Sequence, residues 1–311
     1  MINLGIEHKS IDYVEIDEKA VRAYNALYEH LHKPQSVIGW NLCPDILVHG
    51  SPCQDFSRAG IRLGGKDEDK TRSSLMFETL RIIESMGEWK PKVVIWENVK
   101  GVLDKDMIHS FNKYLDYISN LGYTNSYEVI NAMDYGIPQK RERIFTISIL
   151  NGKPFNFSKM RKRQLRPIDE FIEVDVNDIY TIKSPSMLKK IGDSDSSFGG
   201  RLTPIKDHVW TITTKQNRCP NSGIIPINDS QYRLLTEREC WRLMGFDDKD
   251  YEKVLSEHPT RIGCTNGTLY KIAGNSIVVQ VLEAIFEVLL SDDVEDDDFF
   301  QESDGQMKLV L

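Results

Sequence analysis

Apolar and polar residues alternate with two different periods along the first half of the chain. Apolar residues recur three or four positions apart over 18–31 and 74–87, which predicts helices with one buried face. Continuous apolar runs such as 46–48 and 93–96 are typical of strands buried on both faces. The predicted order is strand 11–17, helix 18–31, a strand in "PDILVHGSP", helix 74–87, strand 91–99, a helix in "DMIHSFNKYLDYISNLG", then strands in "TNSYEVINAM" and over 141–150. This alternation predicts an α/β fold with a parallel, doubly wound sheet.

The pattern changes after residue 150. Residues 151–232 are rich in Pro, Gly, Ser and Asn, which favours a separate small domain or insertion with short, irregular strands. Helices return with "TERECWRLMGF", where Glu239 follows the predicted N-cap Thr236 by three residues, and with 277–290, an apolar helix expected to pack on the sheet. We therefore expect an α/β domain at 1–150 that resumes at 233–290, a smaller domain at 151–232, and a disordered acidic tail at 291–311.

The composition is that of a soluble globular protein, with 40% hydrophobic and 28% charged residues. No uninterrupted apolar stretch approaches the roughly 18 residues of a membrane span, and the start has no signal-peptide pattern. The cysteines are scattered without paired spacing: Cys43, Cys53, Cys219, Cys240 and Cys264. These features predict a reduced, cytoplasmic protein with no membrane partner, no disulfide framework and no metal site.

The net charge of −8 is unevenly distributed. Residues 151–220 contain 13 Lys and Arg against 8 Asp and Glu, whereas residues 291–311 contain 8 acidic residues and one lysine. Without that acidic end the chain is close to neutral and keeps one basic segment. Such a segment is compatible with a surface that contacts phosphates.

Two candidate catalytic residues follow predicted strands. Cys53 lies on a loop just after the strand that Ser51 and Pro52 end, a place where α/β enzymes keep reactive groups. This segment alone leaves a reactive thiol and a structural cysteine equally open. Glu97 ends a buried strand, where an unpaired charge is costly. Both residues are expected at the carboxyl ends of strands, the edge of the sheet where ligands bind.

Five segments together resemble the C5-cytosine DNA methyltransferases in the family's order and spacing. They are Pro-Cys-Gln in 50–60, Glu-Asn-Val in 96–99, Gln-x-Arg-x-Arg in 137–145, Arg-x-Leu-Thr-x-x-Glu…Arg-Leu-Met-Gly-Phe in 233–246, and Gly-Asn-Ser in 272–282. The resemblance covers nearly the whole chain from residue 5 to residue 290. It implies a Rossmann-like methyltransferase sheet, with a smaller, mostly irregular or β target-recognition domain at 151–232.

This resemblance implies methyl transfer from S-adenosylmethionine to C5 of a cytosine flipped out of double-stranded DNA. Cys53 would add to C6 as the nucleophile and so activate C5. Glu97 would hydrogen-bond N3 and the exocyclic amine, and Arg143 would hold O2. Arg141 would favour the thiolate and orient the loop.

The resemblance also implies contacts to the methyl donor and to DNA. Glu15 would take the ribose hydroxyls and Ile16 would lie against adenine, with Pro52, Asn275 and Ser276 completing the donor site. A glycine-bearing loop at 57–72, with Ser57 and Arg58 as candidate DNA contacts, would close over the flipped base. Thr211 and Ile212 would help to position the DNA backbone; they lie in "VWTITTKQNRCP", which resembles the family's Pro-Thr-Leu-Thr with Trp210 in place of proline. No metal is implied.

One family motif has no counterpart. No Phe-x-Gly-x-Gly precedes Glu15, so we expect the first strand of the sheet to be absent and donor binding to be weak. A late start site or trimmed chain, a natural truncation with little activity, and a partner chain that supplies the strand all remain open. Without such a partner we expect a monomer.

Two alternatives come from other classes of protein. Relatives that methylate tRNA share the catalytic motifs, but they carry a Cys-Phe-Thr signature that this chain lacks. A non-catalytic DNA-binding or decoy protein is compatible with the missing donor motif and the acidic tail. The preferred interpretation is a C5-cytosine DNA methyltransferase in a bacterial or phage restriction–modification or phage-protection setting.

Overall fold

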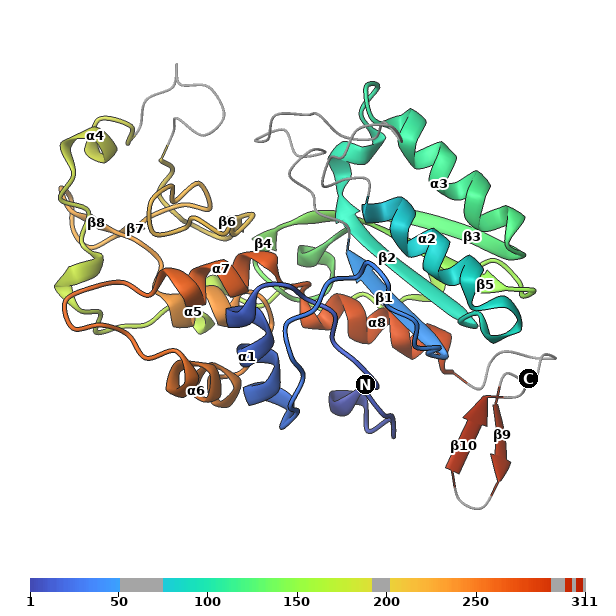
Figure 1. Cartoon of the computed structure of the whole chain (residues 1–311). Coiled ribbons are helices and arrows are strands. Elements are labelled where there is room, and N and C mark those ends of the chain that lie inside the picture. Colours follow the sequence, from blue (N-terminus) through green and yellow to red (C-terminus); the bar gives the residue numbers. More distant parts are fainter. Residues whose placement is uncertain (51–74, 192–201, 292–299, 304–305, 310–311) are drawn as a thin grey trace.

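The computed structural model describes residues 1–50, 75–191, 202–291, 300–303 and 306–309 (Figure 1). Its central sheet has four strands in the order β1 (Ile46–Gly50), β2 (Val93–Val99), β5 (Glu142–Leu150) and β3 (Tyr123–Asn131). The pairing of β1 with β2 is parallel, whereas β5 runs antiparallel between β2 and β3.

The α/β class is confirmed, but the prediction of a wholly parallel sheet is wrong. A parallel strand requires a crossover of a dozen or more residues, usually a helix, to return the chain to the starting edge. Only ten residues, 132–141, separate β3 from β5, and they form one short 3-10 turn and β4 (Gln139–Lys140). The chain therefore re-enters the sheet in the opposite direction.

Helices cover both faces of this sheet (Figure 1). On one face, α2 (Leu75–Ser85) and α3 (Ile108–Asn120) enclose Val94 and Trp96 of β2. On the other face, α8 (Val279–Leu289) shares a core cluster with Ile95, the residue between them. Alternate residues of a strand point to opposite faces, so the apolar run in β2 serves both layers. The predicted packing of the C-terminal helix on the sheet is confirmed.

The helix boundaries follow local signals. Helix α1 (Glu18–Tyr28) ends three residues before the predicted end, because the residue that follows it, Glu29, has a left-handed φ of 57°. Helix α2 stops just before Gly87, which has a φ of 59°. Helix α5 (Glu237–Arg242) begins with the predicted capping box, in which the side chain of Thr236 accepts from the amide of Glu239 and the side chain of Glu239 accepts from the amide of Thr236.

The predicted strand at 11–17 is not formed. A strand requires a neighbour for its backbone groups, and none of the strands that the structure describes pairs with this segment. The segment is instead held by side chains, because the Asp12 carboxylate accepts from Gln35 and, at 2.7 Å, from the indole of Trp40.

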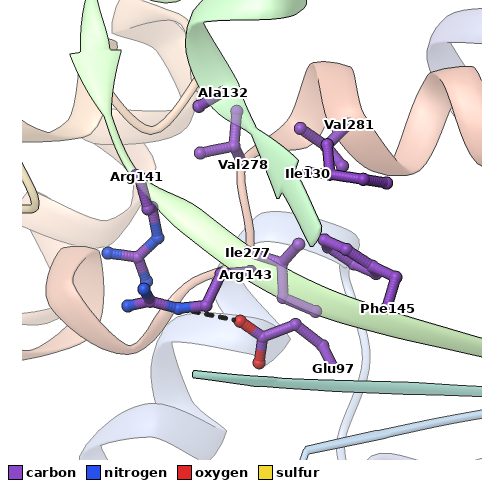
Figure 2. Close-up of a pocket in the computed structure, with 9 residues that line it drawn as sticks. All are labelled: Glu97, Ile130, Ala132, Arg141, Arg143, Phe145, Ile277, Val278 and Val281. Atoms are coloured by element: carbon purple, nitrogen blue, oxygen red, sulfur yellow. Dashed lines mark ion pairs between the residues drawn. The ribbon is translucent and has the colours of Figure 1, made fainter. Parts of the chain in front are cut away.

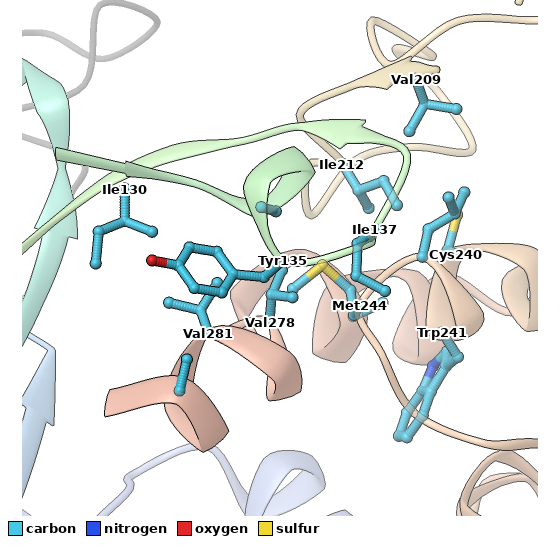
Figure 3. Packing of buried hydrophobic residues seen from close by; sticks show 14 of the residues in the cluster. Ile130, Tyr135, Ile137, Val209, Ile212, Cys240, Trp241, Met244, Val278 and Val281 are labelled. Carbon is cyan, nitrogen blue, oxygen red and sulfur yellow. The ribbon is translucent and has the colours of Figure 1, made fainter. Parts of the chain in front are cut away.

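Residues after β5 form short elements, as predicted. These are α4 (Pro185–Leu188), β6 (Val209–Trp210), β7 (Ile225–Pro226), β8 (Tyr232–Arg233), and the 3-10 turns Phe157–Lys159, Ile168–Glu170 and Asp178–Tyr180. Strand β6 pairs with β4, and β7 pairs with β8. One core cluster contains residues of both this region and the α/β layer, among them Ile130, Tyr135, Ile137, Val209, Ile212, Cys240, Trp241, Met244, Val278 and Val281 (Figure 3). A smaller cluster of Ile182, Leu202, Ile224 and Leu234 lies within the region itself.

Three helices complete the last part of the chain: α6 (Asp248–Glu257), α7 (Gly267–Asn275) and α8. Within residues 267–289, an 18-residue window has a mean hydropathy of 1.6, enough by length and composition for one membrane span. They are nevertheless divided between α7 and α8, whose buried residues contribute to the main core. Each of these helices is shorter than the 20 or so residues of a typical span.

The acidic end contains ordered structure where the sequence predicts disorder. Strands β9 (Phe300–Ser303) and β10 (Gln306–Leu309) pair antiparallel.

Candidate active site

A pocket lies near the carboxyl end of β2 (Figure 2). It has a volume of about 220 Å³, counting space open to solvent. Its wall is apolar except for one carboxylate and two guanidinium groups; the lining residues are Glu97, Ile130, Ala132, Arg141, Arg143, Phe145, Ile277, Val278 and Val281. An apolar pocket with a few convergent polar groups is the usual form of a site for a small ligand.

Glu97 reaches this pocket from β2. In the sheet register it is opposite Phe145 on β5 and Gly50 on β1. Strand β1 therefore ends directly beside the Glu97 carboxylate. The predicted meeting of the ends of these two strands at one edge is confirmed.

Glu97 and Arg143 form an ion pair across the pocket. Glu97 Oε1 lies 3.1 Å from Arg143 Nε, and the side chains are only 16% and 17% exposed. The guanidinium also donates to the Glu142 carbonyl at 2.8 Å. Partial exclusion of water strengthens such a charge-assisted contact, so the pair fixes both side chains.

Arg141 has a different environment from Arg143. It is 4% exposed, and its guanidinium donates to three main-chain carbonyls: Ile212 at 3.0 Å, Gly274 at 3.2 Å and Ser276 at 2.9 Å. Arg141 therefore connects the pocket wall to the end of α7 and to the segment after β6. This geometry suits a positioning residue better than a group that contacts a substrate.

Sequence reasoning assigned no role to Gln139, although it opens the Gln-x-Arg-x-Arg motif. Its side chain is fully buried, donates to the Leu243 carbonyl at 2.7 Å and accepts from the Ile212 amide at 3.0 Å. Residues 139, 141 and 143 are two positions apart, and this period-2 spacing was the available signal that they share a side. Gln139 thus binds the amide of Ile212, and Arg141 binds its carbonyl.

A second missed residue is Gly274. A Cβ atom there would lie 2.5 Å from the carbonyl carbon of Thr213 and 2.5 Å from the amide nitrogen of Thr214. Only glycine allows the two backbones to approach this closely. The Gly-Asn-Ser motif thus packs against the segment that follows β6.

The candidate donor residues Glu15, Ile16, Asn275 and Ser276 lie on two segments that the structure brings together. Ile16 is 74% exposed, while the Glu15 carboxylate accepts from the Asp17 amide at 2.8 Å. The Asp17 carboxylate pairs with the ammonium group of Lys271 on α7, and this hydrogen bond lowers the pKa of Asp17 below its usual range. Lys271 is one helical turn before Asn275, and the Ser276 carbonyl accepts from Arg141 in the pocket.

The donor candidates Glu15 and Ile16 have the chemistry that contact with a nucleoside requires. A carboxylate oxygen accepts hydrogen bonds from vicinal hydroxyls, and an exposed aliphatic side chain offers a flat ring an apolar surface. Both features occur at Glu15 and Ile16, close in the chain to the Asp17–Lys271 pair. The residues present therefore fit S-adenosylmethionine. Where the structure describes the chain, it brings no three His, Cys, Asp or Glu side chains together as metal ligands.

Four predicted site residues fall in the segment 51–74, outside the described residues: Pro52, Cys53, Ser57 and Arg58. The two predicted DNA contacts after β6 have different environments. The Thr211 hydroxyl donates to the Lys140 carbonyl at 3.0 Å, whereas the Ile212 side chain is 1% exposed and packs in the core. Only the main chain of Ile212 is therefore placed to position its neighbours.

The fold and this pocket define an α/β protein with a Rossmann-like sheet that carries a Glu–Arg site at its strand ends. A family model for the C-5 cytosine-specific DNA methylase matches residues 2–193 and 182–291. The chain belongs to this family, so the resemblance found in the motifs is confirmed.

Bacterial relatives agree with this assignment, and a solved structure shows the fold. Type II methyltransferase M2.ScrFI of Lactococcus lactis subsp. cremoris is 37% identical over 79% of this chain and 66% of its own length. Type II methyltransferase M.NgoBI of Neisseria gonorrhoeae is 33% identical over 77% of this chain and 72% of its own length. The chain thus spans about two thirds of these relatives. The crystal structure of S. pombe Dnmt2 methyltransferase has a TM-score of 0.71 and 21% identity, with 95% of both chains covered, and shows the shared fold.

Proposed function

We propose that this chain transfers a methyl group from S-adenosylmethionine to C5 of a cytosine extruded from double-stranded DNA. The observation that carries the proposal is the pairing of Glu97 with Arg143 in an apolar pocket beside the end of β1. The Type II methyltransferase names of its relatives support a restriction–modification or phage-protection setting, in the cytoplasm.

Cys53 acts as the nucleophile in this proposal. It is three residues after Gly50, which pairs with Glu97, so the length of the chain keeps it within about 11 Å of the Gly50 Cα atom. Its thiolate adds to C6 of the ring, and the electron pair displaced from the C5–C6 double bond makes C5 nucleophilic. After C5 has taken the methyl group, loss of the C5 proton to a base lets the sulfur leave and restores the ring.

Glu97 and Arg143 stabilise the charge that this addition places on the pyrimidine. The Glu97 side chain binds the exocyclic amine and, when protonated, donates to N3. Arg143 donates to O2, on the other side of N3. Two fixed groups on adjacent strands cost little reorganisation during the reaction, which is how a preorganised site lowers a barrier.

S-adenosylmethionine supplies a methyl group on a positively charged sulfur, ready for transfer to carbon. Glu15 is assigned to the ribose hydroxyls, Ile16 to the adenine face, and Pro52, Asn275 and Ser276 to the methionine end. The hydrogen bond that the Arg141 guanidinium donates to the Ser276 carbonyl connects this donor site with the pocket.

The direct test incubates the purified full chain with radiolabelled S-adenosylmethionine and duplex DNA, and measures 5-methylcytosine. A duplex with 5-fluorocytosine at the target should give an adduct that survives denaturant, and Cys53→Ser should abolish both signals. Cys264→Ser, at an exposed cysteine, is the matched control and should retain them.

Two other outcomes would replace the proposal. Methylation of transfer RNA in preference to the duplex would assign the same chemistry to RNA. Tight duplex binding by the wild-type chain, with neither methyl transfer nor an adduct, would assign a DNA-binding or decoy role.

A further inference from the structure

An exposed aromatic ring and a cation lie together beside the pocket residues. Trp210, in β6, is 45% exposed, and Lys140 Nζ lies 5.0 Å from the centroid of its ring. Strands β4 and β6 pair in parallel with Lys140 directly opposite Trp210, which places both side chains on one face. The ring of His208 meets the indole edge to face at 5.9 Å.

The backbone on either side of this pair is fixed. The Trp210 amide donates to the Ser222 carbonyl at 2.8 Å, and the Thr211 hydroxyl donates to the Lys140 carbonyl. The residue that follows Lys140 is the pocket arginine Arg141, and it donates to Ile212, two residues after Trp210. The ring is therefore held at a set separation from the pocket.

The surroundings of Trp210 are basic although the chain is acidic overall. Three cations in 206–218 are exposed, with one exposed acidic residue among them: Lys206, Lys215 and Arg218, against Asp207. In Figure 1, β6 and the carboxyl end of β2 both lie on the upper side of the molecule. DNA that presents a base to the pocket would meet Trp210 and its partner Lys140 on this side.

This combination suits a nucleic acid better than another protein surface. Aromatic side chains stack on any nucleobase, and a lysine ammonium binds phosphate as a point charge. Extrusion of a base from a duplex exposes the faces of the bases that remain, and an aromatic ring can cover one of them. An isolated exposed tryptophan would be an ordinary surface residue, but Trp210 has a paired cation and a fixed backbone.

We propose that Trp210 and Lys140 form a DNA contact next to the pocket, in which the indole stacks on a base exposed by extrusion of the target cytosine and Lys140 binds a neighbouring phosphate. The inference rests on the proposed function, because it takes the extruded base as given. It adds a base-contacting residue at the position where the family's Pro-Thr-Leu-Thr element has proline.

The test measures binding of a labelled duplex by fluorescence anisotropy at several salt concentrations. Trp210→Ala should weaken binding by about five- to 150-fold, as loss of one aromatic–base stack does, with the slope of affinity against salt unchanged. Lys140→Ala should also weaken binding, but it should reduce that slope by about one, because one phosphate contact is lost. Trp210→Phe should retain most of the affinity.

Two matched controls use residues away from the pocket. Trp89 is 65% exposed and lies just before β2, at the opposite end of that strand from Glu97. Lys249 is exposed on α6. Trp89→Ala and Lys249→Ala should leave the affinity unchanged, and thermal unfolding checks that all variants fold.

The proposal is overturned if Trp210→Ala binds within twofold of the wild type, or if Trp89→Ala loses as much affinity. If Trp210→Ala fails to fold, the variants Trp210→Phe and Lys140→Glu decide the test. Lys140→Glu must then weaken DNA binding strongly, and Trp210→Phe must not. Failure of the proposed function is seen separately, as absence of the 5-fluorocytosine adduct with the wild-type chain.

Discussion

Glu97 and Arg143 are diagonal neighbours on two antiparallel strands, and their side chains meet at 3.1 Å on one face of the sheet. Glu97 is opposite Phe145 and Val99 is opposite Arg143, so the register of β2 and β5 alone brings the two charges together. A shift of one residue would move one of them to the other face. The candidate site therefore depends on strand register.

Glu97→Gln should lower the rate of methyl transfer by about 10²- to 10⁴-fold with little change in duplex affinity. The amide retains the size of the carboxylate but cannot supply a proton to N3, so the loss appears in the transition state. Steady-state kinetics with radiolabelled donor would give kcat and KM separately.

The matched control is Glu128→Gln, the same substitution at an exposed position on β3, which should leave kcat unchanged. A Glu97→Gln variant with nearly wild-type kcat would remove Glu97 from the chemistry. A rise in KM alone would reduce its role to binding.

The sequence was sufficient to predict the strand ends on which the site is built. The apolar runs over 46–48 and 93–96 identify β1 and β2, and their common edge follows from parallel pairing. The reversal of β5 was not predictable from hydrophobic pattern, because strand direction depends on the connection before it. The Arg141 and Gln139 contacts were also hidden, because their partners are 71 to 135 residues away in the chain.

Gly274→Ala should destabilise the fold by about 1–3 kcal/mol, because the new methyl group would overlap the backbone of Thr213 and Thr214. The strain must separate α7 from the segment after β6 or displace the carbonyl that Arg141 binds. Urea unfolding measures the change in the free energy of unfolding.

Gly267→Ala is the control in the same helix. Its Cβ would meet only the side-chain nitrogen (Nδ2) of Asn217, at an ordinary 3.6 Å, so this substitution should be neutral or slightly stabilising. Equal unfolding midpoints for the two variants would show that the close approach at Gly274 is unimportant.

Glu239→Gln should cost about 3–5 kcal/mol of the free energy of unfolding. Glu239 is fully buried and binds both terminal nitrogens of Arg233, at 2.7 and 2.9 Å, and also accepts the Thr236 and Glu173 amides. Gln would leave the buried arginine charge without its counter-ion. The NH2 group of Gln would also face N–H groups that can only donate hydrogen bonds.

Glu170→Gln makes the same change in an exposed pair with Arg166, where the side chains are 46% and 53% exposed. It should cost less than about 1 kcal/mol, because water screens exposed pairs. Similar costs for the two substitutions, measured by urea unfolding, would contradict a structural role for the buried pair.

His49 should make the fold less stable as the pH falls. Its ring packs against Trp96 and Tyr114, and burial lowers the pKa of His49 from its usual value near 6.5 to about 3. Between these two pH values the unfolded chain binds a proton that the folded chain does not, so the free energy of unfolding must fall on acidification. A single proton limits this loss to about 1.4 kcal/mol for each pH unit below 6.5.

His49→Gln removes the titrating group, so its unfolding free energy should decline less steeply than that of the wild type between pH 6.5 and 4.5. Urea unfolding at several pH values measures both slopes. His109→Gln, at an exposed position at the start of α3, should follow the wild-type slope. Parallel slopes for His49→Gln and the wild type would mean that the ring is protonated as readily in the folded chain as in the unfolded one, and that its packing against Trp96 does not exclude the charged form.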